Sequence, residues 1–312
     1  MTDELALPEG VTIEDIKHAF ETMSLEEMVA FMPESPDTAE LVAHYPNLAA
    51  VEVRDVAIAG RHGEVRARHY RVPGDLSGAG LVWVHGGGFI GGDLDMAESH
   101  WVGLTIAARG FPVLAVEYTK CLDGVHYPVP SDDILDAWLW ACANSVELGT
   151  TADRLHIGGA SAGGNLTAGV VKRLRDDASP MPASLVLVYG LVHPELPPMS
   201  ESLATSVAQL GSFTPEAVRG INLMYVDDEA GLADPYAFAA NGDTSGQPPV
   251  YVLNSEADSL RASGEAYAAQ LENAGVVVKV EFEPGTGHGH LNQPFLPGGE
   301  RSLDRIAEWL DS

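Results

Sequence analysis

Short apolar runs alternate with helical segments through most of the chain, and this alternation constrains the fold more than any other feature. Each run has the length of a strand that is buried on both faces. The runs are Leu81–Val84, Val113–Glu117, Leu155–Gly158, Leu185–Tyr189, Val250–Asn254 and Val276–Phe282. This order of elements predicts an α/β fold with a mostly parallel, doubly wound sheet and helices on both of its faces.

Two further strands precede this alternation, which brings the expected sheet to about eight strands. Residues Val51–Ala59 and Glu64–Arg71 read as an antiparallel pair joined through a glycine-containing turn. Two later segments have the apolar spacing of helices that pack on a sheet. Their apolar positions are Leu135, Trp138, Leu139 and Cys142 in the first, and Leu303, Ile306, Ala307 and Leu310 in the second.

Two segments depart from the strand and helix alternation. Residues 1–50 read as helices that are separate from the sheet. From residue 195 the chain becomes rich in Pro, Gly, Ser and Asp, with an inserted helix expected near Pro215–Val226. We expect residues 1–50 and the insertion 195–235 to form a helical lid. The core domain then comprises residues 51–194 and 236–312.

Charge and cysteine content exclude several functional classes. The 312 residues include 45 acidic and 17 basic side chains, a formal net charge of −28. So negative a chain repels phosphate backbones and anionic membranes, which disfavours nucleic-acid binding. No run of apolar residues is long enough for membrane insertion. With no secretory signal and only two cysteines, Cys121 and Cys142, we expect a cytoplasmic protein.

A glycine-rich turn after the strand at Leu155 gives the first indication of chemistry. Residues 159–163 read Gly-Ala-Ser-Ala-Gly, a G-x-S-x-G pattern between a strand and an apolar helix. A serine in that setting occupies a strained turn, and the small residues around it let the turn close. The alternative is a chance match in a glycine-rich chain. The strand–turn–helix setting favours Ser161 as a nucleophile.

A nucleophilic serine needs a base, and the base needs an orienting carboxylate. The strand that begins at residue 250 is followed by Glu256 and Asp258, and the strand that begins at 276 is followed by His288 and His290. Asp258 lies two positions further into its loop than Glu256, so we favour it. The competing interpretation of Asp258 is a helix N-cap. The two histidines could hold zinc, but no further Cys or His cluster accompanies them, so we expect no metal.

A second glycine-rich segment follows the strand at residues 81–84. Residues 85–92 read His-Gly-Gly-Gly-Phe-Ile-Gly-Gly, and the glycines match the G-x-G-x-x-G of a dinucleotide site. The same residues match an HGGG loop, whose backbone N–H groups bind an oxyanion. A dehydrogenase would leave Ser161, Asp258 and His288 without a role, whereas a hydrolase explains every motif. We therefore expect no cofactor.

Together these motifs resemble those of the bacterial hormone-sensitive-lipase-like esterases, an α/β-hydrolase family, from about residue 81 to residue 290. Residues 85–89 resemble the family's HGGGF loop, and residues 159–164 its GDSAGG turn, with Ala160 in place of the acidic residue. Residues 256–261 resemble its E-x-D-P-L-R-D loop, with Ser259 in place of proline. The resemblance implies an α/β-hydrolase fold with a helical lid, a small-molecule ester substrate and, in many members, a homodimer.

The resemblance also implies roles for individual residues. It favours His288 over His290 as the base, and it assigns the oxyanion to the backbone N–H groups of Gly87, Gly88 and Ala162. The residues expected to shape the two loops are His85, Gly86, Gly159 and Gly163. Candidates for the substrate pocket are Phe89, Leu223, Met224, Tyr225 and His290, with Met23, Met28 and Phe31 in the N-terminal helices.

The expected function is therefore that of a serine carboxylesterase. Ser161, His288 and Asp258 would hydrolyse short-chain acyl or aryl esters through an acyl-enzyme intermediate. One alternative is the hydrolysis of amides, carbamates or lactones by the same three residues. Another is a small-ligand receptor on this fold that has no turnover.

Overall fold

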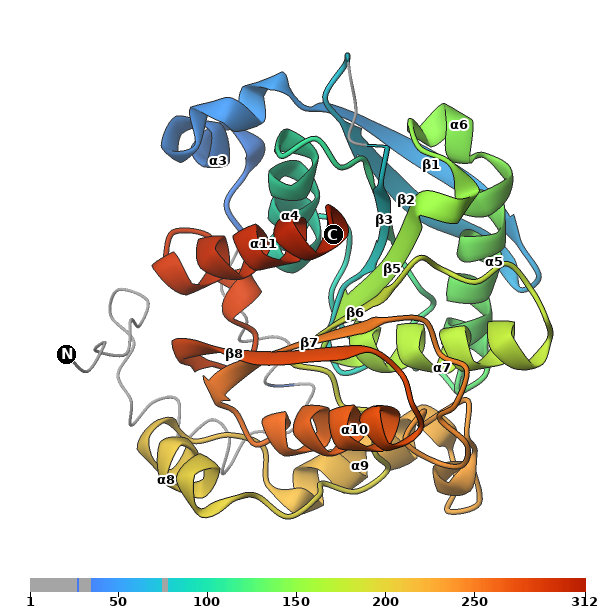
Figure 1. The fold of residues 1–312 in the computed structure, drawn as a ribbon, viewed down its shortest axis with the longest axis vertical. Helices are drawn as coiled ribbons and strands as arrows, with labels where there is room; N and C mark the ends of the chain where they lie inside the picture. Colours follow the sequence, from blue (N-terminus) through green and yellow to red (C-terminus); the bar gives the residue numbers. More distant parts are fainter. Residues whose placement is uncertain (1–26, 28–34, 75–77) are drawn as a thin grey trace.

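An eight-stranded sheet runs through the centre of the molecule (Figure 1). The structure is a computed structural model that describes Glu27 and residues 35–74 and 78–312. The strands are β1 (Glu52–Gly60), β2 (Gly63–Arg71), β3 (Gly80–Val84), β4 (Val113–Val116), β5 (Leu155–Ala160), β6 (Leu185–Val188), β7 (Val250–Ala257) and β8 (Val278–Gly287). Their order is β1-β2-β4-β3-β5-β6-β7-β8. β2 is antiparallel to β1 and β4, and the remaining neighbours are parallel, which confirms the expected architecture.

Helices cover both faces of the sheet. One face carries α3 (Thr38–His44), α4 (Ala97–Ala108) and α11 (Pro297–Leu310), and the other carries α5 (Val129–Ala143), α7 (Ala162–Asp176) and α10 (Arg261–Asn273) (Figure 1). Shorter elements are α6 (Ser145–Leu148) and the 3-10 helices η1 (Pro46–Ala50), η2 (Ala152–Arg154), η3 (Gly231–Ala233) and η4 (His290–Asn292). Within the described ranges, every helix is too short or too polar to span a bilayer.

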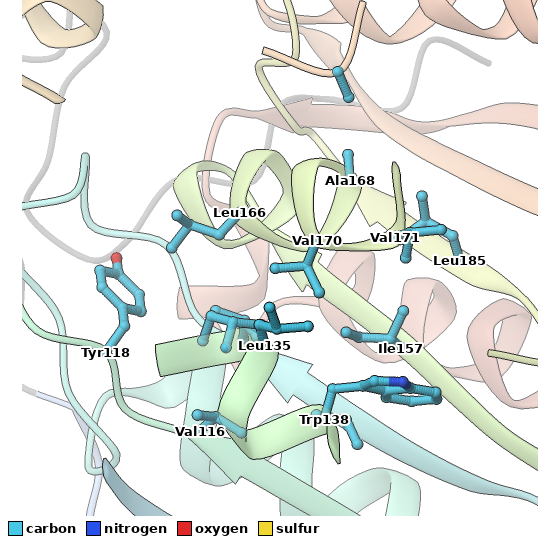
Figure 2. Close-up of a cluster of buried hydrophobic side chains, with 14 of the residues drawn as sticks. Val116, Tyr118, Leu135, Trp138, Ile157, Leu166, Ala168, Val170, Val171 and Leu185 are labelled. Atoms are coloured by element: carbon cyan, nitrogen blue, oxygen red, sulfur yellow. The ribbon is translucent and has the colours of Figure 1, made fainter. Parts of the chain in front are cut away.

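Apolar side chains fill the space between the sheet and each helical layer. The central strands β3 to β6 are buried along their whole length, as their continuous apolar sequences predict. Figure 2 shows one of these clusters, in which Leu166 and Val170 of α7 lie close to Leu135 of α5 and Ile157 of β5. The apolar face expected on α11 is confirmed, because all four of its residues are buried.

The face expected on α5 is wrong in part. Leu139 is 38% exposed and Cys142 is only partly buried. The buried side of the helix instead follows Ile134, Trp138 and Ala141, whose spacing turns Leu139 toward solvent. The i, i+3, i+4 pattern identified the helix correctly, but it wrongly included Leu139 and Cys142 in the buried face.

Two helices, α8 (Glu201–Leu210) and α9 (Pro215–Val226), form the insertion between β6 and β7. Each begins at a hydroxyl cap, because Ser200 accepts the N–H of Leu203 and Thr214 accepts the N–H of Ala217. The helix expected near Pro215–Val226 therefore has a companion that the sequence pattern did not indicate. Most of the N-terminal part of the expected lid, with Met23, Met28 and Phe31, lies outside the described residues, and the lid stays a prediction.

Candidate active site

The carboxyl ends of four parallel strands bring the sequence motifs to one edge of the sheet. Val84 at the end of β3 pairs with Gly159 near the end of β5, and Ala257 of β7 pairs with Gly287 of β8. The glycine loop follows β3, and Ser161 follows β5. Asp258 and His288 follow β7 and β8. In open α/β sheets this is the edge at which ligands bind.

Ser161 occupies a strained turn between β5 and α7. Its φ is 51° and its ψ is −118°, a positive φ that non-glycine residues rarely adopt. The turn requires glycine on both sides. A Cβ on Gly159 would lie 2.5 Å from the Gly163 carbonyl, and a Cβ on Gly163 would lie 2.2 Å from the carbonyl oxygen of Val84. The Ser161 N–H donates to the Val188 carbonyl at 2.9 Å, which fixes the turn against β6.

The three side chains expected to form a triad lie within hydrogen-bond distance of one another. The Oγ of Ser161 lies 2.9 Å from Nε2 of His288, and Nδ1 of His288 lies 2.7 Å from Oδ2 of Asp258. The Asp258 carboxylate is completely buried. Its other oxygen, Oδ1, accepts the N–H of Leu260 at 3.0 Å and a bond from Ser212 Oγ at 3.2 Å. The N-cap interpretation of Asp258 is wrong, because Leu260 is the N-cap residue of α10 and no side chain caps that helix. One oxygen of Asp258 accepts the Leu260 N–H, and the other faces His288.

The surroundings of His288 favour its protonated form. Burial opposes the imidazolium charge, but the Asp258 carboxylate and its hydrogen bond outweigh burial and raise the pKa of His288 above its ordinary value. The rings of Tyr189 and Phe213 pack edge-on against the imidazole, with centroids 5.1 Å and 5.0 Å away. The histidine can accept the proton of Ser161 and hold it as an ion pair with Asp258.

Hydrogen bonds also fix the glycine loop after β3. The Gly86 carbonyl accepts Nδ1–H of His85 at 2.7 Å and the Tyr118 hydroxyl at 2.8 Å. A trans peptide is planar, so these bonds direct the N–H of Gly87 to the opposite side. Among the described residues, no backbone carbonyl accepts the N–H of Gly87, Gly88 or Ala162. The oxyanion role expected for these three N–H groups requires donors that are not already bonded in this way.

His85 is buried, and its two ring nitrogens contact the Gly86 carbonyl and Lys120. Burial and the nearby Lys120 ammonium keep the pKa of His85 well below its ordinary value, so the ring is neutral. Lys120 Nζ lies 3.3 Å from Nε2 of His85. An ammonium can only donate, so Nε2 accepts and Nδ1 carries the proton that holds the Gly86 carbonyl. This arrangement agrees with the loop-shaping role expected for His85.

Glu98 is a component of the site that the sequence analysis missed. This buried carboxylate in the first turn of α4 accepts the Gly86 N–H at 2.5 Å, the Tyr189 hydroxyl at 2.6 Å and Asn292 Nδ2–H at 3.2 Å. Burial raises its pKa. Glu98 thus links the glycine loop to the ring that packs on His288. In sequence it looks like an ordinary acidic residue at a helix start.

The expected pocket residues lie in two kinds of environment. Phe89 and Tyr225 stack with their rings 4.1 Å apart and nearly parallel, and both belong to the buried core that joins the glycine loop to α9. Leu223 and Met224 of α9 are partly exposed. Phe213, which packs on His288, comes from the α8–α9 loop and was not among the candidates.

His290 requires a correction, because the structure does not place it beside Ser161. Its Nδ1 lies 2.8 Å from the Ser255 hydroxyl and its Nε2 lies 2.8 Å from the Ser302 hydroxyl. Burial lowers the pKa of His290 to about 3, so the ring stays neutral. Both ring nitrogens are engaged inside the protein, which makes His290 neither a base for Ser161 nor a pocket residue.

Comparisons with known proteins give relatives of this chain in both sequence and fold. A family model described as "alpha/beta hydrolase fold" matches residues 81–292. The chain is 32% identical to the carboxylic ester hydrolase LipN of Mycobacterium tuberculosis over 80% of this chain and 67% of the relative. It is also 32% identical to the ethyl acetate hydrolase of Pseudomonas putida, over 83% and 82%. A solved esterase of the bacterial hormone-sensitive lipase family superposes with a TM-score of 0.73 at 26% identity, over 98% of this chain and 93% of that one.

Proposed function

Because the chain belongs to the α/β-hydrolase fold family, and within it to the hormone-sensitive-lipase-like esterases, we propose that it is a serine carboxylesterase that uses Ser161, His288 and Asp258. Its substrates are small esters with short acyl chains or aryl groups. The relatives named as ester hydrolases support the activity, and the 2.9 Å approach of Ser161 Oγ to His288 Nε2 carries the assignment of the residues.

The reaction takes place in two steps. The Ser161 oxygen forms a bond to the ester carbonyl carbon while its proton passes to Nε2 of His288. The single bond between that carbon and the alcohol oxygen then breaks, and His288 transfers the same proton to the departing alcohol oxygen. Water attacks the acyl-enzyme in the second step, again with His288 as the base, which releases the acid and restores Ser161. Asp258 stabilises the imidazolium in both steps.

The oxyanion of each tetrahedral intermediate is bound by the N–H groups of Gly87, Gly88 and Ala162. Ala162 is the first residue of α7, so the positive end of that helix adds to the stabilisation. The bonds from His85 and Tyr118 to the Gly86 carbonyl support this assignment, since they orient the Gly87 N–H before the substrate arrives.

Initial rates on p-nitrophenyl esters from acetate to decanoate test this proposal, with the wild type measured beside Ser161→Ala. We expect hydrolysis that depends on Ser161 and falls as the acyl chain lengthens. Wild-type rates that equal those of Ser161→Ala on every ester would overturn the proposal. Equal rates on acetate and decanoate would overturn the preference for short chains.

We also propose that the protein acts as a homodimer in the cytoplasm. The dimer rests on the family resemblance, and the location is supported by the free thiols of Cys121 and Cys142, which a reducing compartment preserves. Sedimentation equilibrium should give the mass of two chains, and cell fractionation should recover the protein in the cytoplasmic fraction. A single-chain mass would overturn the dimer.

A further inference from the structure

We propose that Ser212 and Ser259 are hydrogen-bonded to each other's loops and together position the carboxylate of Asp258; we call this pair the clasp. The inserted segment between β6 and β7 then contributes a positioning residue to the catalytic site. This inference rests on the proposed function. Ser212 lies in the loop between α8 and α9, and Ser259 lies between Asp258 and α10. Both are positioning residues, because they act on the reaction through Asp258 and His288.

The bonds of the clasp have defined directions. The Ser212 hydroxyl accepts the N–H of Ser259 at 2.9 Å and donates to Oδ1 of Asp258 at 3.2 Å. The Ser259 hydroxyl donates to the carbonyl of Phe213 at 2.9 Å, and the two hydroxyl oxygens lie 2.9 Å apart. The side chain of Ser212 thus binds the backbone N–H of Ser259, and the side chain of Ser259 binds the backbone carbonyl of Phe213. These two bonds connect the α8–α9 loop to the loop before α10.

The clasp contacts two residues that touch the catalytic histidine, Asp258 and Phe213. Oδ1 of Asp258 has two donors, Ser212 and the Leu260 N–H, and they leave Oδ2 facing His288. Phe213, whose carbonyl the clasp holds, packs its ring against the imidazole. Because Asp258 is completely buried, water cannot replace a lost donor without a rearrangement.

Residue 259 distinguishes this chain from the loop pattern that residues 256–261 resemble. The loop that residues 256–261 resemble has a proline at this position, and proline has neither an N–H nor a hydroxyl to offer. With serine here, the N–H of Ser259 donates to the Ser212 oxygen. The Ser212 proton then has two acceptors within reach, Oδ1 of Asp258 at 3.2 Å and the Ser259 oxygen at 2.9 Å.

The test is the pH profile of a Ser212→Ala variant on p-nitrophenyl acetate. Loss of a hydrogen bond to a charged group should lower kcat about tenfold or more. The carboxylate, with one donor fewer, attracts the His288 proton more strongly, so the acidic limb of kcat/KM should move to higher pH. Ser212→Thr keeps the hydroxyl and should restore both values. Ser259→Ala keeps the N–H and should lower kcat less, with the acidic limb unmoved.

Ser302→Ala is the matched control. Ser302 is a buried serine bonded to His290, which has no place in the proposed chemistry. Its loss should leave the acidic limb in place. Should Ser212→Ala not fold, Ser212→Cys fills the same space with a weak donor and should shift the limb in the same direction.

The outcomes separate the two proposals. A wild type without Ser161-dependent turnover would refute the proposed function itself. A Ser212→Ala variant with wild-type kcat and an unmoved acidic limb would refute the clasp and leave the proposed function intact. An equal shift in Ser302→Ala would also refute the clasp, because the effect would then be general.

Discussion

The Ser161 hydroxyl and the His288 imidazole meet at 2.9 Å although 127 positions separate them in the sequence and two strands separate them in the sheet. β6 and β7 lie between the strands that carry them, so the loop after β8 extends back over both. Tyr189 at the end of β6 and Asp258 at the end of β7 contact the imidazole from these positions. Each strand from β5 to β8 is thus followed by one residue of this cluster: Ser161, Tyr189, Asp258 and His288 in that order.

Removal of the serine or the histidine should abolish most of the activity. We expect Ser161→Ala and His288→Ala to lower kcat by about 10⁴–10⁶, because the two residues act as a unit. His290→Ala is the control, since both nitrogens of that ring are bonded to serines other than Ser161. Steady-state kinetics on p-nitrophenyl acetate measure all three variants. Full activity in His288→Ala beside an inactive, folded His290→Ala would reverse the assignment of the base.

Activity should depend on the protonation of His288. The base works only when neutral, and its pKa lies above the ordinary value of 6.5, so kcat/KM should rise with pH through a midpoint above 6.5. Asp258→Asn removes the charge that raises this pKa. The midpoint should then move to lower pH, while kcat falls by roughly 10⁴. If the midpoint of the rise in kcat/KM is the same in Asp258→Asn as in the wild type, the rise is due to the titration of a group other than His288.

The hydroxyl of Tyr118 should affect kcat only through its hydrogen bond to the glycine loop after β3. Tyr118→Phe removes one of the two donors to the Gly86 carbonyl and leaves the bond from His85. We expect kcat to fall about tenfold with KM nearly unchanged, less than the 10²–10³ that loss of an oxyanion donor itself costs. Tyr236→Phe, which removes an exposed bond to Asp176, serves as the matched control. Equal kinetics in the two variants would contradict the orienting role.

Glu98 should contribute to stability as well as to activity. Glu98→Gln keeps the shape, but its amide NH2 turns one acceptor into a donor facing Gly86 N–H or Tyr189 O–H. One unmade buried hydrogen bond should cost about 1–3 kcal/mol of unfolding free energy. Urea unfolding measures this cost, with the exposed Glu308→Gln of α11 as the control. A Glu98→Gln variant as stable as the wild type would show that the network tolerates either group.

Much of this fold could be predicted from the sequence because the strands are short, apolar and bounded by turn residues. Ser161 could be predicted too, since its strained turn demands glycine at fixed neighbouring positions. Ser212 could not, because its partner Ser259 is 47 positions away and no spacing rule joins two loops of that kind. Glu98 was missed for a related reason: an acidic residue at the start of a helix is common, and only tertiary packing turns it into a buried acceptor.

The most direct measurement is the mass of the enzyme stopped in acid during turnover of p-nitrophenyl acetate. We predict one acetyl group per chain, on the peptide that contains Ser161. Ser161→Ala should carry none, and His288→Ala should acquire it far more slowly. Turnover with no acetylated enzyme, or with the acetyl group on another residue, would contradict the account.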